Sequence, residues 1–361
     1  MKLVESQDGA QPRAMGAQGA NAVTLDDVAL AAGVSTATVS RVINNVPRVA
    51  PDTRRRVLDA IERLRYAPNF AGRSLATRRT QTLGLIIADI TNPFYPAVVR
   101  GVEAAALAQG FSVLLYDTAE DKQREAQALQ LLSERQVDGL VVCSSRLGKA
   151  RLAQLTQGKT PIIFVNSTPP PSTVGSVETD HEAGMLAALE HLYHLGHRRI
   201  AYLGGPPASH VQQRRVKAFH AFGERADVML SESSHAPTVA GGEEGAMALL
   251  RDQETTQRPT AIITYNDLMA AGALLAAHAC GISTPQELSL IGHDDIPMAA
   301  LLSPALTTVR QPMQELGMRA VQMLIAHLTS TVAANPTTLS LKPELIVRDS
   351  TCPPRPVVSG S

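Results

Sequence analysis

The sequence is poor in cysteine and aromatic residues and has no long apolar run. Its 361 residues include three cysteines, no tryptophan and only 3% aromatic residues. Cys143, Cys280 and Cys352 are far apart and form no C-x-x-C pair, which argues against a disulfide framework and a thiolate metal site. No apolar run approaches the ~18 residues of a membrane span, and the first twenty residues lack the apolar core of a signal peptide. These absences predict a soluble, cytoplasmic protein with no membrane partner.

The motifs of common enzyme classes are missing as well. The sequence contains no P-loop, GxSxG or HExxH motif, and no GxGxxG follows a strand-like run. His191, His194 and His197 resemble a metal cluster, but Gly196 is expected to end the helix before His197. The sequence therefore predicts no enzyme, no metal site and no cofactor.

The formal net charge is zero, but the charge is unevenly distributed. Residues 21–80 contain ten Arg and only five Asp or Glu, a net charge of +5, so residues 81–361 carry −5. A basic segment at one end of a mildly acidic chain indicates a polyanionic partner there.

Residues 23–66 are expected to form three short helices. Thr24 and Asp27 have the spacing of a capping box, Gly33 permits a tight turn, and Ser35 is placed to cap the second helix. Two short helices joined by a Gly-containing turn are typical of the helix-turn-helix. A third helix is expected to begin at Pro51 and to close a small core with Val57, Leu58, Ile61 and Leu64. A purely structural three-helix bundle remains the alternative.

From residue 83 onward, apolar runs of strand length alternate with amphipathic stretches such as 95–109 and 123–135. Continuous apolar runs are typical of parallel strands that are buried on both faces. More than ~200 residues of this alternation fit two doubly wound α/β sheets better than one. The runs are 83–88, 111–116, 139–143, 161–165, 199–204, 261–265 and 288–292.

Several of these stretches resemble the lactose-repressor (LacI/GalR) family. VTLDDVALAAGVSTATVSRVIN (23–44), YAPN (66–69) and SLATRRTQTLGLIIADITNPFY (74–95) are similar to that family's head, hinge and first sensor strand. The similarity continues through 194–206, 265–274, 288–295 and 303–312. It implies a sequence-specific transcriptional regulator, which we expect to be a repressor. The implied fold is an all-α helix-turn-helix head plus an α/β sensor with two doubly wound parallel-sheet lobes of the type I periplasmic-binding-protein kind.

The resemblance and the composition together predict five segments. Residues 1–22 form a disordered tail, 23–68 the DNA-binding domain, and 69–80 a hinge helix and linker. Residues 81–350 form the effector-binding domain, with an N-lobe of about 81–180 and 311–339 and a C-lobe of about 181–310 and 340–350. The Pro/Ser-rich residues 351–361 are expected to be a disordered tail.

The resemblance also implies which residues contact DNA. Thr36, Ala37 and Arg41 are expected to face base edges. Near bases or phosphates we expect Thr24, Ser35, Thr38, Ser40, Asn44 and Arg48. The hinge is too short to be helical alone, and Leu75 is the implied wedge between base steps. The hinge residues expected at DNA are Asn69, Gly72, Arg73, Leu75 and Ala76. A merely basic linker is the alternative.

Polar residues follow the apolar runs, at the strand ends where open α/β sheets bind ligands. Amide, carboxylate and hydroxyl groups in such a ring suit a sugar or sugar derivative, and a nucleoside or nucleobase is the alternative. The candidate effector-binding residues are Asp89, Asn92, Phe94, Tyr95, Ser144, Asn166, Arg215, Asn266 and Asp294. Asn266 could instead cap a helix, and Arg215 could be a surface residue.

The sequence departs from the family on one side of this expected pocket. Ala218 stands where the family has glycine, and Pro237, with His235 close by, stands where relatives often have a stacking aromatic. On that side the resemblance therefore does not define the shape of the pocket, or the identity of the effector.

Two other protein classes share the sensor fold. A sugar-binding transport protein would need a signal peptide and would have no use for residues 1–80. A nucleotide-cofactor enzyme would need a glycine fingerprint. The preferred interpretation is a homodimer that binds an imperfect palindromic operator and a small-molecule effector.

We expect the affinity for operator DNA to fall steeply with salt. Each Arg or Lys that neutralises a phosphate releases counterions, with a log–log slope of roughly −0.9 per contact. Titrating an operator duplex at several salt concentrations measures this slope. A flat response would contradict a DNA interface built on the basic segment.

Overall fold

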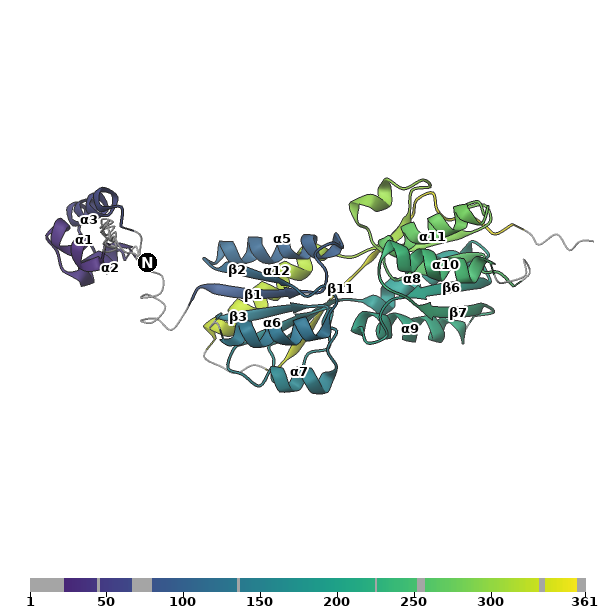
Figure 1. The fold of residues 1–361 in the computed structure, drawn as a ribbon, viewed down its shortest axis with the longest axis horizontal. Coiled ribbons are helices and arrows are strands. Elements are labelled where there is room, and N and C mark those ends of the chain that lie inside the picture. Colours follow the sequence, from purple (N-terminus) through teal and green to yellow (C-terminus); the bar gives the residue numbers. More distant parts are fainter. Residues whose placement is uncertain are drawn as a thin grey trace, which may run out of the picture. The chain divides into compact units, whose positions relative to one another are not determined.

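The computed structural model describes residues 23–43, 46–66, 80–134, 137–224, 226–251, 257–330 and 335–355. The chain divides into two compact units, Met1–Thr77 and Arg78–Ser361 (Figure 1). Outside the described residues lie the predicted N-terminal tail, most of the hinge with Asn69, Gly72, Arg73, Leu75 and Ala76, and Asn44. Those predictions stay predictions.

The first unit contains the three predicted helices, α1 (Leu25–Ala32), α2 (Thr36–Ile43) and α3 (Pro51–Leu64). The capping box is present, since the Thr24 hydroxyl accepts from the Asp27 N–H and the Asp27 carboxylate accepts from the Thr24 N–H. Gly33 ends α1 in the left-handed conformation, with φ of 63°. The Ser35 hydroxyl accepts from the Thr38 N–H and caps α2. The expected local signals are therefore confirmed.

The core of this unit is small, and one predicted member is wrong. Leu58 is 49% exposed, whereas its neighbour Val57 is fully buried. Adjacent helical residues point about 100° apart, so α3 cannot bury both. Ala60 takes the buried position instead, and Ile61 and Leu64 are partly buried. The buried residues are Val28, Ala29, Ala32, Val39, Val42, Val57, Ala60 and Tyr66.

The second unit has the two predicted sheets, and each has six strands, with the order β11-β5-β4-β3-β1-β2 in the N-lobe. All the pairs in this sheet are parallel. Its strands are β1 (Thr82–Ile87), β2 (Ser112–Asp117), β3 (Gly139–Cys143), β4 (Ile162–Val165), β5 (Gly175–Thr179) and β11 (Thr337–Leu341). Its helices are α5 (Phe94–Ala108), α6 (Lys122–Glu134), α7 (Lys149–Leu155) and α12 (Met313–Thr329).

The C-lobe repeats this order as β12-β10-β9-β8-β6-β7, with only the β10–β12 pair antiparallel. Its strands are β6 (Arg199–Gly204), β7 (Met229–Ser234), β8 (Ala261–Thr264), β9 (Ser289–Asp294), β10 (Thr307–Arg310) and β12 (Glu344–Ile346). Its helices are α8 (His181–His194), α9 (His210–Gly223), α10 (Val239–Arg251) and α11 (Asp267–Ala279), with a short 3₁₀ turn at Pro297–Ala300.

Helices cover both faces of each sheet (Figure 1). In the N-lobe, α5 and α12 pack on one face, and α6 and α7 pack on the other. In the C-lobe, α10 and α11 cover one face, and α8 and α9 cover the other. Each lobe is therefore a three-layer sandwich whose sheet is buried from both sides, which explains the continuous apolar runs in the sequence.

The chain passes between the lobes three times. The crossings lie between β5 and α8, between β10 and α12, and between β11 and β12. The Asp180 N–H donates to the Leu341 carbonyl at 2.8 Å, which ties the first crossing to the third. The predicted lobe boundaries are close to these crossings, although β11 extends the N-lobe to Leu341 rather than to residue 339.

The structure corrects the interpretation of one strand and adds five others. The run 111–116 becomes β2, an edge strand rather than a strand buried on both faces, and Leu114 and Leu115 are each 44% exposed. The strands β5, β7, β10, β11 and β12 were not predicted. Each is short or rich in polar residues, so it lacks the apolar run by which the other strands are recognised.

The predicted C-terminal disorder is wrong for residues 351–355, which pack against the C-lobe. The Cys352 N–H donates to the Ser289 hydroxyl at 3.1 Å, and the Cys352 carbonyl is 2.9 Å from Nε2 of His197. His191 contacts the Thr351 hydroxyl at 3.0 Å. Two members of the histidine group in the sequence thus hold this C-terminal strap, defined as residues 351–355.

We expect acid to weaken this attachment. Burial lowers the pKa of His197 from 6.5 to about 4. Because the unfolded chain takes up this proton at higher pH than the folded chain, the free energy of unfolding should fall as pH drops from 6.5 to 4, by at most about 1.4 kcal/mol per pH unit. Urea unfolding of the His197→Gln variant should show a shallower pH dependence in this window. The same substitution at the exposed His278 is the control, and equal slopes in all three proteins would refute the assignment.

Candidate functional site

The carboxyl ends of the strands of both sheets carry the predicted polar residues. In each sheet the strand order reverses beside the first strand, between β1 and β3 in the N-lobe and between β6 and β8 in the C-lobe. Such switch points leave a crevice beyond the strand ends. Ser144 follows β3, Asn266 lies just beyond β8, and Asp294 ends β9. The topology thus explains why residues distant in the sequence meet.

One cavity collects nearly all of the predicted effector residues. Its volume is about 30 Å³, which is room for only one or two water molecules. Because both lobes contribute to its wall, a larger ligand can enter only when the lobes move apart. This central cavity is lined by Asn92, Phe94, Tyr95, Ser144, Asn166, Val211, Arg215, Tyr265, Asn266, Asp294 and Gln311.

Arg215 is the only strong positive charge of the central cavity. It is 1% exposed, which excludes the alternative of a surface arginine. Its guanidinium donates to the Tyr265 carbonyl at 2.5 Å and lies over the Tyr265 ring at 5.3 Å. Among the described residues, no acceptor bonds to its buried Nε. A buried donor without a partner costs roughly 1–3 kcal/mol, so this atom is a candidate point of ligand contact.

Asp294 faces the same cavity. Burial raises the pKa of its carboxyl group to about 7, against the opposing effect of the Arg215 charge. Its Oδ1 accepts a hydrogen bond from the Gln311 amide at 2.5 Å. Near neutral pH this carboxyl group can therefore both donate and accept hydrogen bonds, as recognition of a hydroxyl group requires.

A chain of hydrogen bonds joins Arg215 to Asp294 around the cavity. Arg215 lies 3.5 Å from Nδ1 of His181, and Nε2 of His181 lies 3.2 Å from Oδ1 of Asn166. Asn166 donates to Oε1 of Gln311 at 3.4 Å, and Gln311 donates to Asp294. Burial, aided by the Arg215 charge, keeps the pKa of His181 well below its usual range. The ring is therefore neutral, accepting at Nδ1 and donating at Nε2.

Three residues of the cavity have a backbone that side chains rarely adopt. The φ angles of Ser144, Asn166 and Asp294 are 57°, 49° and 111°. Each follows or ends a buried strand, where the chain turns sharply to present its side chain. Backbone strain concentrates at functional sites, and its occurrence at three strand ends of one cavity supports a binding role.

The aromatic residues form an apolar wall. The Phe94 and Tyr95 rings meet edge to face, with centroids 5.1 Å apart. Burial holds the pKa of Tyr95 well above its usual range. Tyr265 adds a third ring, and its hydroxyl lies 3.1 Å from the Ser209 hydroxyl. A polar ring with an apolar wall is the usual composition of a small-molecule site.

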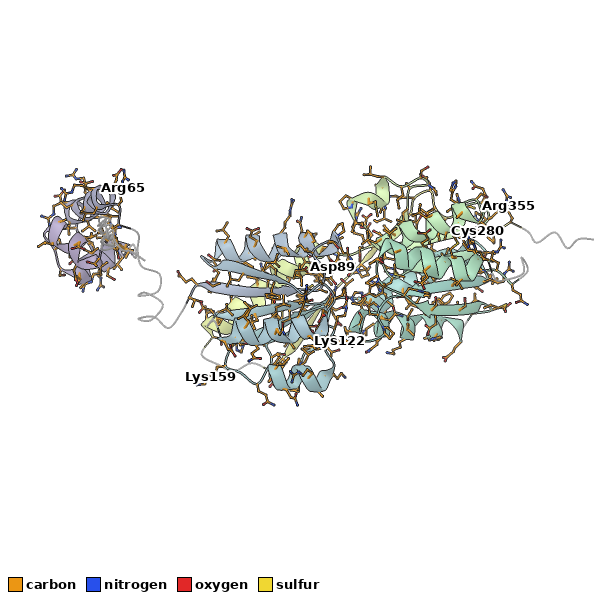
Figure 2. All side chains as sticks on the ribbon, in the orientation of Figure 1. Arg65, Asp89, Lys122, Lys159, Cys280 and Arg355 are labelled. Atoms are coloured by element: carbon orange, nitrogen blue, oxygen red, sulfur yellow. The ribbon has the colours of Figure 1, made fainter. Side chains whose placement is uncertain are left out.

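The structure does not bring Asp89 into the central cavity. Asp89 lies where the two lobes meet (Figure 2), but its carboxylate is bound to Thr91, to the N–H at 2.9 Å and to the hydroxyl at 2.6 Å. It shapes the turn after β1. Asn266 lines the cavity and also caps α11, since its Oδ1 accepts from the Met269 N–H and its amide donates to the Pro237 carbonyl.

Sequence reasoning missed four residues of this region: Val211, Tyr265, Gln311 and His181. Tyr265 and Gln311 could have been found by the strand-end argument, because they follow β8 and β10 directly. His181 and Val211 carry no such signal, since they begin helices whose position only the folded sheet determines.

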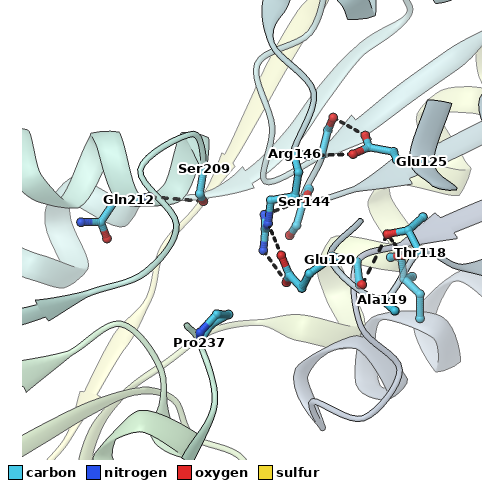
Figure 3. Close-up of polar contacts among 12 residues, drawn as sticks. Thr118, Ala119, Glu120, Glu125, Ser144, Arg146, Ser209, Gln212 and Pro237 are labelled. Carbon is cyan, nitrogen blue, oxygen red and sulfur yellow. Dashed lines mark hydrogen bonds and ion pairs between the residues drawn. The ribbon is translucent and has the colours of Figure 1, made fainter. Parts of the chain in front are cut away.

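The N-lobe rim of the cleft contains a buried ion pair. Arg146 donates to both carboxylate oxygens of Glu120, and at 2.8 Å to the carbonyl of Ser144 (Figure 3). Glu125 accepts from the Arg146 N–H at 2.8 Å and from the Ser145 hydroxyl. Ser144 and Arg146 are therefore held in place on the side of the cleft that faces Ser209 and Pro237 of the C-lobe.

The predicted DNA-reading residues lie on and around α2. Val39 and Val42 are buried, whereas Ala37 and Arg41, one turn apart, are exposed on the same face. Thr36 and Ser40 are partly exposed, and the Thr38 hydroxyl is bonded to that of Ser35. Arg48 is exposed in the loop before α3, where Arg54 donates to the Val46 carbonyl at 2.8 Å. The helix thus has a small polar face of the kind that enters a major groove.

Comparisons with known proteins identify the family to which this architecture belongs. Residues 24–69 match the model of the bacterial regulatory proteins of the lacI family, and residues 189–351 match the periplasmic binding protein-like domain. The transcriptional regulator DegA of Bacillus subtilis is 34% identical over 336 residues, which cover 91% of this chain and 98% of DegA. The chain belongs to the LacI family.

Solved structures agree with this assignment. A lac repressor dimer bound to operator and the anti-inducer ONPF matches this LacI-family chain with a TM-score of 0.82 and 28% identity, over 91% of this chain and 99% of that one. A complex of the regulator CelR with cellobiose matches with a TM-score of 0.68 and 29% identity, over 91% and 99%. The predicted fold class and family are therefore confirmed.

The described part of this LacI-family chain contains neither a membrane-spanning helix nor a metal-binding cluster. Among those residues no helix is long and apolar enough to cross a membrane. In the same ranges, no group of three or more His, Cys, Asp or Glu side chains could hold a metal ion.

We expect Arg215→Met to abolish ligand binding in the central cavity without unfolding the protein. Arg215 bonds to the Tyr265 carbonyl and to His181 and forms no ion pair with a described carboxylate. Its replacement by Met of similar length therefore leaves no ion-pair partner unpaired, and the free energy of unfolding should change by less than about 2 kcal/mol. A thermal-shift screen with sugars and nucleosides, followed by calorimetry, should show the loss. A matched substitution, Lys217→Met at an exposed position of the same helix, should leave binding intact, and a ligand that binds both variants equally would contradict the site.

Proposed function

We propose that this protein is a cytoplasmic transcriptional repressor whose affinity for its operator is controlled by a sugar or sugar derivative bound in the central cavity. The observation that carries the proposal is the convergence of a buried guanidinium with an unpaired Nε, a carboxyl group whose pKa is raised to about 7, and four amide side chains in one cavity between two lobes. Its relatives are regulators rather than enzymes, and the proposed activity needs no cofactor.

The chemistry of the cavity favours a polyhydroxylated ligand. Hydroxyl groups both donate and accept hydrogen bonds. The carboxyl group of Asp294 can do both, and the Asn92 amide, whose Oδ1 already accepts from the Phe94 N–H at 3.0 Å, can donate through its nitrogen. Phe94 and Tyr95 offer an apolar face for the carbon skeleton of a ring. The CelR structure holds cellobiose, so the same fold accommodates a sugar in a relative.

The aromatic wall also fits a nucleoside or nucleobase, which is the second candidate. Three rings line the cavity, and a base can stack on any of them. The two candidates differ in ultraviolet absorbance and in the groups they offer Asp294, so a ligand screen separates them directly.

The ligand should act by changing how the lobes are arranged. The cavity has a volume of only about 30 Å³ in this structure, so a ligand of the size of a sugar must change the relative positions of the lobes or select a different arrangement. It can shift the equilibrium only by its differential affinity for the two arrangements. We infer that the paired hinges follow this equilibrium and that Leu75, which the resemblance places as the wedge, enters or leaves the minor groove with it.

A homodimer on an imperfect palindrome is part of the same proposal. One head presents only the short polar face of α2, and two-fold proteins read two-fold sites. The lac repressor relative is a dimer on its operator. In this chain the exposed Leu114 and Leu115 of the edge strand β2 offer apolar surface that a second copy can cover.

Operator binding by Arg41→Ala tests the DNA-reading function. The exposed Arg41 side chain should contact a base edge, so its loss should weaken operator binding by about 1–3 kcal/mol and reduce discrimination against random DNA. Fluorescence anisotropy on operator and random duplexes, at one fixed salt concentration, gives both affinities.

Arg63→Ala is the matched control, because Arg63 is equally exposed but lies in the last turn of α3. It should change the two affinities by similar, small factors. If Arg41→Ala lowers both affinities equally, α2 does not read bases and the proposed orientation of the head is wrong.

A further inference from the structure

A second cavity lies between the same two lobes and is larger than the first. Its volume is about 230 Å³, well above what a single water molecule needs. This seam cavity is lined by Ser145, Leu147, Gly148, Lys149, Leu152, Ser167, Thr168, Ala208, His210 and Gln213. The first seven belong to the N-lobe and the last three to the C-lobe.

The two cavities are neighbours but not one site. Three backbone segments contribute consecutive residues, one to each cavity: Ser144 and Ser145, Asn166 and Ser167, Val211 and His210. These segments form a shared wall, so a ligand in the seam cavity lies next to the effector site without using Arg215 or Asp294.

The polar groups of the seam cavity are built into the fold. The Ser167 hydroxyl accepts from the Ser145 N–H at 2.8 Å, and the Thr168 hydroxyl lies 2.8 Å from Nδ1 of His210. Nε2 of His210 is 2.8 Å from a carboxylate oxygen of Glu178. The Thr168–His210 contact crosses from one lobe to the other, so a ligand beside it touches both lobes.

The charge balance of the seam cavity favours an anionic group. Two acids bond to lining or neighbouring residues, and both are occupied: Glu178 by His210 and by Arg214 at 3.9 Å, and Glu125 by the Ser145 hydroxyl and the Arg146 N–H. Lys149 is exposed at the rim, and no acidic side chain of the described ranges lies within ion-pair distance of it. An ammonium group beside hydroxyl, amide and imidazole groups matches a phosphate ester on a polyhydroxylated body.

We propose that the seam cavity is a second ligand site, selective for a small phosphorylated sugar. Lys149 holds the phosphate, and Thr168, His210 and Gln213 contact the hydroxyl groups. Because the site is complete only when both lobes meet, its ligand favours the closed arrangement and couples to the effector site through the shared wall. The site uses none of the charged groups of the central cavity and stands independently of the identity of the effector there.

Calorimetry on the full chain tests the proposal. The probes are glucose 6-phosphate, fructose 6-phosphate and ribose 5-phosphate, with the three free sugars and inorganic phosphate as references. At least one phosphate ester should bind the Arg215→Met variant, whose central cavity is disabled. Lys149→Ala should weaken that binding about tenfold or more, because a charge-assisted contact is lost, and Ala208→Phe should abolish it by filling the cavity.

Lys159→Ala is the matched control, since Lys159 is an exposed lysine of the same lobe away from the cleft (Figure 2), and it should leave the affinity unchanged. The proposal is overturned if no phosphate ester binds, or if inorganic phosphate binds as tightly as the esters. It is also overturned if binding survives Lys149→Ala but is lost in Arg215→Met, because the ligand then occupies the central cavity. In that last case the effector site stands and only the second site fails.

Discussion

The buried side chain of Gln311 joins the two lobes at the central cavity. It lies on the crossing between β10 and α12, accepts from the Thr179 hydroxyl at 2.8 Å on the N-lobe side, and donates to Asp294 on the C-lobe side. Both partners are buried. Movement of one lobe against the other must break or exchange these buried bonds, which favours a small number of discrete arrangements over a continuum.

The same network keeps the central cavity ready for a ligand. His181 is neutral and bridges Arg215 to Asn166, so the guanidinium is fixed before any ligand arrives. Rigid placement lowers the entropy that binding must offset. The buried Nε of Arg215 has no partner among the described residues, and burial disfavours the charged form of Asp294. Both groups therefore cost free energy until a ligand bonds to them. A ligand that forms hydrogen bonds with these two groups removes that cost, and its affinity for the site increases by the same free energy.

The features shared with the LacI family and the residues that depart from it lie in different parts of the protein. The head, the sheet order and the cleft follow the lac repressor pattern. The Pro237 carbonyl accepts from the Asn266 amide, and Pro237 lies across the cleft from Arg146 (Figure 3), at a position where the resemblance to the family implies an aromatic side chain. Selectivity among ligands should therefore come from this side, while transmission to DNA depends on the shared crossings.

The sequence alone determined the elements that depend on local chemistry or on an unbroken apolar pattern. The capping box of Thr24, the turn at Gly33 and the strand 139–143 are examples, because a hydrogen bond between near neighbours or a two-sided core leaves a direct trace in the residues. Most of the cavity could also be predicted, since parallel strands present their carboxyl ends at one edge. Only the tertiary structure decided that Asp89 bonds to Thr91 and not to the cavity, and that Gln311 and His181 join the lobes. It also decided that residues 351–355 pack as a strap and that Leu58 faces solvent. These outcomes depend on which distant surfaces meet, and contacts between residues more than a hundred positions apart, such as Asn166 and Gln311, leave no period or motif in a single sequence.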